Sequence, residues 1–151
     1  MTFEEAAILA NQELFQLLHV KRLIATDYQP FEVGAGGDIS SGIDLKAEEI
    51  FVKHLSPFGT ILSEESGTFS HPTSAIEIIL DPIDGSDNLL SHLPYFGTSI
   101  AYMEEGKCMH AIITNLANGD IFIKNHEGIK KATLNHLIFE NGTCNPSSKA
   151  T

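Results

Sequence analysis

One stretch near the middle of the chain limits most strongly what this chain can fold into. It reads Ile76-Glu77-Ile78-Ile79-Leu80-Asp81-Pro82-Ile83-Asp84-Gly85-Ser86-Asp87-Asn88. The apolar residues before Asp81 predict a buried strand bounded by turn residues. Proline fixes φ and removes a hydrogen-bond donor, so we expect the strand to stop at Asp81. The segment Asp84-Gly85-Ser86 suits the start of a helix, whose free N–H groups can bind an anion.

Carboxylates suited to a hard cation therefore stand beside amides suited to a phosphate, which indicates metal-assisted phosphate chemistry. Two other interpretations compete with it. These residue types are also ordinary turn residues, and an acidic turn after a strand is often purely structural. A calcium-binding loop needs acids or amides at its first, third and fifth positions. Counted from Asp81, the third and fifth positions hold Ile83 and Gly85, which excludes the calcium loop.

The charge of the chain limits its partners. Its 151 residues suit about one domain, and they include 9 basic and 20 acidic residues for a net charge of -11. An acidic chain lacks the basic surface that binds nucleic acid, so we expect no nucleic-acid partner. If the acids of residues 38–87 converge, their repulsion requires a cation. These acids are Asp38, Asp44, Glu64, Glu65, Asp81, Asp84 and Asp87.

No targeting or membrane segment is predicted. The first residues have no basic stretch followed by an apolar run, so we expect no signal peptide. No apolar stretch is long enough to cross a membrane. Cys108 and Cys144 form no C-x-x-C motif, so neither a zinc site nor a redox pair is indicated. We therefore expect a cytoplasmic protein.

The helices are predicted at the start of the chain. Thr2 and Glu5 form a capping box, and apolar residues at helical spacing continue from Phe3, so we expect a helix that ends near Thr26. A second helix is predicted with Asp44 as its N-cap and an end before Pro57.

The strands are predicted in the rest of the chain, at residues 60–63, 76–80, 96–103, 108–116 and 121–124. A loop at residues 64–67 and a polar connector at 68–74 separate the first two strands. The predicted fold is α+β, with two N-terminal helices packed on a mostly antiparallel sheet. We expect one metal-binding domain over residues 1–140 and a linker or tail over residues 141–151.

Three segments together resemble the inositol monophosphatase family of the magnesium-dependent, lithium-sensitive phosphatases. Asp81 to Asn88 matches the family pattern D-P-[IL]-D-G-[ST]-x-N, which is a specific signal. Glu64-Glu65-Ser66 resembles the family's G-E-E-S, with Ser63 in place of the usual Gly. Asp38-Ile39-Ser40-Ser41 with Asp44 resembles its D-x-V-T-x-x-D. The implied fold is that of a sugar-phosphatase-like N-terminal domain.

The resemblance implies a role for each matched residue. Glu64, Asp81 and the Ile83 carbonyl would hold one Mg²⁺, and Asp81 and Asp84 would share a second. Asp84 would also lie against the substrate, whose phosphate Gly85 and Ser86 would meet with backbone N–H groups. Glu64, with the Ser86 hydroxyl and Asp38 near it, would orient and activate the attacking water. Asp87 and Asn88 are interpreted as residues of the helix start.

One departure from the family is serious. The family continues with a second α/β half that carries a W-D-x-A-like segment, whose Asp completes the metal site. These 151 residues contain no Trp and therefore no such segment. The chain resembles the first half of such an enzyme, with the C-terminal α/β half absent.

The function predicted from the resemblance is Mg²⁺-dependent hydrolysis of a phosphate monoester such as inositol monophosphate, by a metal-activated water. The alternative substrates are fructose 1,6-bisphosphate and 3'-phosphoadenosine 5'-phosphate. A catalytically silent metal-binding fragment is the alternative from another class. An acidic protein-interaction domain would leave the ordered acids unexplained. The expected partner is a small-molecule phosphate ester, with no nucleic acid and no membrane, and a homodimer is left open.

Overall fold

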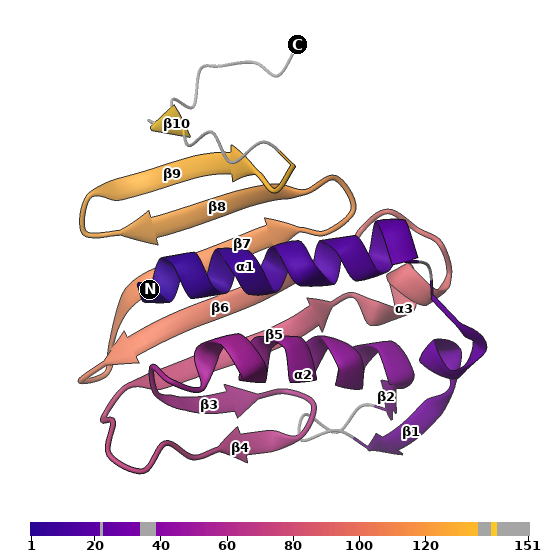
Figure 1. Ribbon diagram of the computed structural model, residues 1–151, viewed down its shortest axis with the longest axis horizontal. Helices are drawn as coiled ribbons and strands as arrows, with labels where there is room; N and C mark the ends of the chain where they lie inside the picture. Colours follow the sequence, from indigo (N-terminus) through magenta and orange to yellow (C-terminus); the bar gives the residue numbers. More distant parts are fainter. Residues whose placement is uncertain (22, 34–38, 136–139, 142–151) are drawn as a thin grey trace.

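The structure is a computed structural model, and it describes residues 1–21, 23–33, 39–135 and 140–141. Two long helices, α1 (Phe3–Gln16) and α2 (Gly42–Leu55), lie side by side on one face of an eight-stranded sheet (Figure 1). A short helix, α3 (Ser86–Leu90), follows the strand β5 (Glu77–Asp84). The strands β1 (Pro30–Val33) and β2 (Ile39–Ser41) form a separate two-stranded antiparallel sheet.

The large sheet has the order β10-β9-β8-β7-β6-β5-β3-β4. Its strands are β3 (Thr60–Ser63), β4 (Gly67–Phe69), β5 (Glu77–Asp84), β6 (Gly97–Glu104), β7 (Lys107–Asn115), β8 (Asp120–Asn125), β9 (Gly128–Thr133) and β10 (Glu140–Asn141). Among the described strands, β3 and β5 are the one pair that is parallel within it, and the other pairs are antiparallel. The predicted α+β fold, with two N-terminal helices on a mostly antiparallel sheet, is therefore confirmed.

The first helix begins as its sequence predicts and ends earlier. The Thr2 side chain accepts a hydrogen bond from the Glu5 N–H, and the Glu5 carboxylate accepts one from the Thr2 N–H, which completes the capping box. The helix becomes a π-helix, η1, at Leu17–Lys21, and a 3₁₀ turn, η2, follows at Ala25–Tyr28. The predicted end near Thr26 is thus wrong, because the α-helical hydrogen bonding stops at Gln16.

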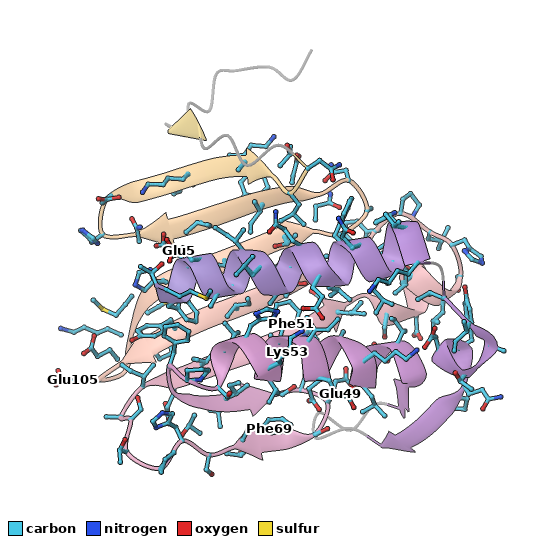
Figure 2. All side chains as sticks on the ribbon, viewed as in Figure 1. Glu5, Glu49, Phe51, Lys53, Phe69 and Glu105 are labelled. Atoms are coloured by element: carbon cyan, nitrogen blue, oxygen red, sulfur yellow. The ribbon has the colours of Figure 1, made fainter. Side chains whose placement is uncertain are left out.

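The cap of the second helix differs from the prediction. Ser41 is the N-cap of α2, and Asp44 lies three residues further on, where its Oδ2 accepts hydrogen bonds from the Ser41 N–H and hydroxyl. The N-cap prediction for Asp44 is therefore wrong, because a capping box places the acid inside the first turn. On the same helix, Phe51 is fully buried and Glu49 is exposed (Figure 2).

The strand β5 runs further than predicted, through Asp81 and Pro82 to Asp84. Its register against β6 shifts between Asp81 and Asp84, which is the mark of a bulge. The Thr98 hydroxyl donates to the Pro82 carbonyl oxygen over 3.0 Å inside this bulge. A proline is tolerated in the strand because the bulge removes the need for its missing N–H.

The segments on either side of this region also differ from the prediction. Residues 67–69 form the edge strand β4, where a loop ending at Gly67 and a polar connector beginning at Thr68 were predicted. The strands β9 and β10 were not predicted. β3 matches its predicted residues, and β6, β7 and β8 match theirs to within a residue or two.

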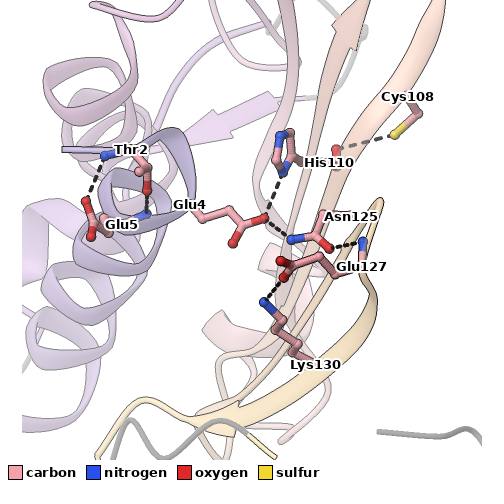
Figure 3. Close-up of polar contacts among 8 residues, drawn as sticks. All are labelled: Thr2, Glu4, Glu5, Cys108, His110, Asn125, Glu127 and Lys130. Carbon is pink, nitrogen blue, oxygen red and sulfur yellow. Dashed lines mark hydrogen bonds and ion pairs between the residues drawn. The ribbon is translucent and has the colours of Figure 1, made fainter. Parts of the chain in front are cut away.

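A polar cluster joins the first turn of α1 to the sheet (Figure 3). Glu4 Oε1 accepts a hydrogen bond from Asn125 Nδ2 over 2.7 Å and lies 2.8 Å from His110 Nδ1. The ring of His110 also packs on Phe3 and Tyr102. These contacts fix the helix start against β7 and β8.

The face of the sheet opposite the helices carries apolar side chains that stay open to solvent. Ile79 on β5 is 48% exposed, Ile113 on β7 is 50% exposed and Phe122 on β8 is 40% exposed. The strand register pairs Asp81 with Ser99, Ser99 with Ile113, and Ile113 with Phe122, so one row of side chains crosses four strands. We call Ile79, Ile113 and Phe122 the open apolar face.

Among the described residues, no helix combines the length and the apolar character needed to span a membrane.

Candidate functional site

The parallel pairing of β3 with β5 brings two predicted site residues together. Ser63 lies opposite Leu80 in this register, so Glu64 and Asp81 are the next residues on the two strands. The Glu64 N–H continues the ladder by donating to the Leu80 carbonyl oxygen over 3.1 Å. Two acids that are 17 positions apart in the sequence therefore meet where β3 ends beside β5.

The surroundings of Asp81 raise the pKa of its carboxyl group. Burial, a hydrogen bond with Glu64 and the charges of Glu64, Asp84 and Glu65 raise the pKa of Asp81 from 3.8 to about 8. Its Oδ1 atom is buried without a hydrogen-bond partner in the described part of the chain. A buried carboxylate oxygen that lacks a donor and is surrounded by other acids is the environment that a bound cation would relieve.

The turn after β5 has the form that its sequence predicts. Gly85 is the N-cap of α3, and its φ of +86° lies in the left-handed region that favours glycine. A Cβ at this position would also stand 2.8 Å from the Tyr95 carbonyl oxygen. That same oxygen accepts a hydrogen bond from Asn88 Nδ2 over 2.8 Å, which agrees with a local structural role for Asn88. Ser86 is the first residue of the helix, and Asp84 before it is exposed.

Two shallow hollows on the sheet adjoin these acids. One, of about 420 Å³, is lined by residues of β3, β5 and β6 that include Glu64, Asp81 and Ser99. The other, of about 310 Å³, is lined by Asp84, Gly85, Asn88 and part of the open apolar face. Both lie beside the side chains that the sequence assigns to metal and phosphate binding.

The predicted catalytic residue Asp38 lies outside the described residues, so its position relative to Glu64 and Ser86 stays a prediction. Asp44 from the same segment is described and is buried. Its Oδ1 has no hydrogen-bond partner among the described residues. Figure 1 shows that α2 begins at the end of the sheet where β3 and β5 finish. β3 ends at Ser63, next to Glu64, and β5 ends at Asp84.

Sequence reasoning missed one residue that organises the site. Glu48 on α2 is only 4% exposed, and it receives three hydrogen bonds from Ser63 and Ser66, the residues on either side of Glu64-Glu65. A signal was present in the sequence. Glu48 lies three positions before Phe51 and seven before Leu55, so it shares their buried side of the helix, where a carboxylate requires polar partners.

The described side chains do not form a ready-made metal site. No group of three or more His, Cys, Asp or Glu among them has an arrangement that could already hold a metal ion. Asp81 is instead hydrogen-bonded to Glu64. The residue types and the unpartnered Oδ1 of Asp81 nevertheless fit Mg²⁺, which takes oxygen ligands and uses few protein carboxylates.

The chain matches the model of the inositol monophosphatase family over residues 2–150. It is 30% identical over 108 residues to Nus factor SuhB of Escherichia coli (strain K12), a match that covers 66% of this chain and 40% of that protein. It is 35% identical over 95 residues to inositol-1-monophosphatase of Mesorhizobium japonicum, covering 61% of this chain and 36% of that protein.

A solved structure agrees in fold. The extragenic suppressor protein SuhB from Bartonella henselae superposes with a TM-score of 0.68 at 28% sequence identity. The match covers 97% of this chain and 53% of that structure. The chain therefore spans about half the length of this relative.

Proposed function

The chain belongs to the inositol monophosphatase family, and from this premise we propose that it supplies the metal- and phosphate-binding part of a Mg²⁺-dependent phosphomonoesterase. The observation that carries the proposal is the strand register that sets Glu64 beside Asp81, whose half-buried carboxyl group also lies near Glu65 and Asp84. In the described part of the chain, none of the ion pairs involves Glu64, Asp81 or Asp84. A cation would balance charges that the protein leaves unbalanced.

We assign the metal ligands as the sequence predicts, to Glu64, Asp81, the Ile83 carbonyl and Asp84. When bound there, Mg²⁺ would neutralise phosphate charge and lower the pKa of the attacking water. Ile83 lies in the β5 bulge, where the strand leaves the regular ladder. The bulge thus changes the backbone direction between the two acids, Asp81 and Asp84, that the proposal places on the cation.

The remaining roles belong to the turn and to Glu64. The first N–H groups of a helix have no intrahelical partner, and those of Gly85 and Ser86 would donate to the phosphate oxygens. Glu64 would accept a proton from the attacking water, and the Ser86 hydroxyl and Asp38 would orient that water. Positioning and charge stabilisation of this kind account for most of the catalysis of phosphoryl transfer.

The proposed substrate is inositol monophosphate, the type of substrate that the name of the Mesorhizobium relative indicates. Fructose 1,6-bisphosphate and 3'-phosphoadenosine 5'-phosphate are the alternatives. We also keep as predictions that the protein is cytoplasmic and binds neither nucleic acid nor a membrane. A homodimer stays open.

The open apolar face favours a second candidate function for the 151-residue chain by itself. Exposed apolar side chains beside the site indicate a surface that another folded unit covers. We expect this unit to be the family's second α/β half, which would also exclude water from the site. Without it, the chain would be a metal-binding unit that releases phosphate very slowly or not at all, because small misplacements cost large factors in rate.

The test is a phosphate-release panel with the three candidate substrates, with and without Mg²⁺. It compares the 151-residue chain with a chain extended by the second half. We expect Mg²⁺-dependent release that lithium inhibits from the extended chain, and little or none from the short one. No release from either chain with any phosphate ester would contradict the proposed function. Rapid release by the short chain that Glu64→Gln abolishes would show that the second half is not required.

A further inference from the structure

A buried carboxylate on α2 holds both ends of the turn that follows β3. The Ser63 hydroxyl donates to Glu48 Oε2 over 2.5 Å, and the Ser66 N–H donates to the same oxygen over 2.9 Å. The Ser66 hydroxyl donates to the other oxygen, Oε1. Glu48 is 4% exposed, so these three donors replace the water that a carboxylate otherwise requires.

The turn that is held in this way carries the acids of the candidate site. Glu64 and Glu65 are the only residues between Ser63 and Ser66. The Glu64 N–H also donates to the Leu80 carbonyl oxygen of β5 over 3.1 Å, so the turn is joined to the neighbouring strand. Hydrogen bonds from both ends of the turn to one buried group restrict its movement relative to β5.

One of the two serines that donate to Glu48, Ser63, differs from the residue that is usual in the family. Ser63 stands where the resemblance expects a glycine, and its side chain is buried, with 5% exposure. Glycine has no hydroxyl and could not make the 2.5 Å hydrogen bond to Glu48. The substitution therefore adds a contact to the turn rather than merely being tolerated in it.

We propose that Glu48 is a positioning residue of the candidate site. Through Ser63 and Ser66 it fixes the Glu64-Glu65 turn against β5, so that Glu64 stands beside Asp81 before the cation arrives. This role rests on the proposed function, because a fixed turn matters for catalysis only if these acids bind the metal. Glu48 itself touches neither metal nor substrate and acts only through the turn.

The test uses variants that cut the contacts one at a time and leave the helix intact. Ser66→Ala removes the hydroxyl bond to Oε1, and Ser63→Gly removes the hydroxyl bond to Oε2. Ser66→Thr keeps a hydroxyl and serves as the rescue, since Ser66 is exposed enough to accept a methyl group. Glu49→Gln is the matched control for Glu48→Gln, because the two acids are neighbours on α2 and only Glu48 is buried.

The readouts are calorimetric Mg²⁺ affinity and the thermal melt of the metal-free protein. We expect Ser66→Ala and Ser63→Gly to melt as folded proteins and to bind Mg²⁺ about tenfold more weakly or worse, as changes to residues that orient metal ligands do. Ser66→Thr and Glu49→Gln should bind as the wild type does. Glu48→Gln should fall between them, because an amide oxygen can accept only part of the three hydrogen bonds.

The measurements distinguish failure of the positioning role from failure of the proposed function. If the wild type binds Mg²⁺ and Ser66→Ala and Ser63→Gly bind it equally well, the positioning role is overturned while the metal site stands. If the wild type binds no Mg²⁺, the proposed function fails, and the positioning role fails with it.

Discussion

The backbone N–H of Glu64 donates a hydrogen bond to the carbonyl oxygen of Leu80, and this single contact sets two acids side by side at the edge of a parallel strand pair. The next residue after Leu80 is Asp81, whose pKa is raised by burial and by the acids Glu64, Asp84 and Glu65 near it. The candidate site is therefore a product of strand register, and changes that disturb the register or the charges should alter it measurably.

The stability of the metal-free protein should depend on pH through Asp81. The pKa of this group is raised from 3.8 to about 8, so between these values the folded chain holds a proton that the unfolded chain has released. Stability contributed by the group therefore falls as pH rises through this window. We expect Asp81→Asn to gain stability relative to the wild type as pH rises from about 4 to about 8.

Denaturant unfolding of both proteins in a chelating buffer measures this difference. Glu49→Gln, which removes an exposed acid, should follow the wild type across the whole pH range. Parallel pH profiles for Asp81→Asn and the wild type would show that the pKa of Asp81 is not raised in the folded chain.

The β5 bulge should depend on the Thr98 hydroxyl. Thr98→Val keeps the shape of the side chain and leaves the buried Pro82 carbonyl without its donor. We expect a loss of about 1–3 kcal/mol of unfolding free energy, the cost of an unsatisfied buried group. The measurement is equilibrium urea unfolding.

Thr68→Val, the same change on the exposed edge strand β4, is the control and should cost little. Equal losses in the two variants would mean that the Thr98 bond does not stabilise the bulge.

The open apolar face should make the 151-residue chain bind a fluorescent apolar dye. Ile113 and Phe122 lie opposite each other on β7 and β8 and are both well exposed. The double variant Ile113→Thr with Phe122→Thr should lower dye fluorescence and any self-association seen by sedimentation. Val20→Thr, at a single exposed apolar position on η1, should change neither. Dye binding that the double variant leaves intact would place the apolar surface elsewhere.

Local interactions explain which parts of the fold the sequence predicts. The capping box of Thr2 and Glu5 and the left-handed Gly85 each depend on residues within one turn, so their patterns were sufficient. The true end of β5 depends on Thr98, which lies 16 positions after Pro82 and pairs with it only in the folded sheet. The N-cap of α2 was misassigned by three residues because Ser41 and Asp44 are both good capping residues.

The candidate site also contains residues that a local motif identifies and contacts that form only in the folded chain. The motif of residues 81–88 identifies Asp81, Asp84, Gly85 and Ser86 without any structure, since they are consecutive or nearly so. The helix pattern indicates that Glu48 is buried and requires polar partners. It does not identify those partners, because Ser63 and Ser66 lie 15 and 18 positions away in the sequence. The structure therefore adds to the site the groups that hold the acids in place.

The measurement that tests the central claim most directly is the thermal melt with and without Mg²⁺. Because Mg²⁺ should bind only the folded chain, a concentration about a hundredfold above its dissociation constant should add about 2.7 kcal/mol of stability. For a chain of this size, that corresponds to a rise of roughly 5 to 10 °C in Tm. Asp84→Asn should shrink the rise, and Glu49→Gln should keep it. Equal melts of the wild type with and without Mg²⁺, or an undiminished rise in Asp84→Asn, would contradict the assignment of these acids to a metal site.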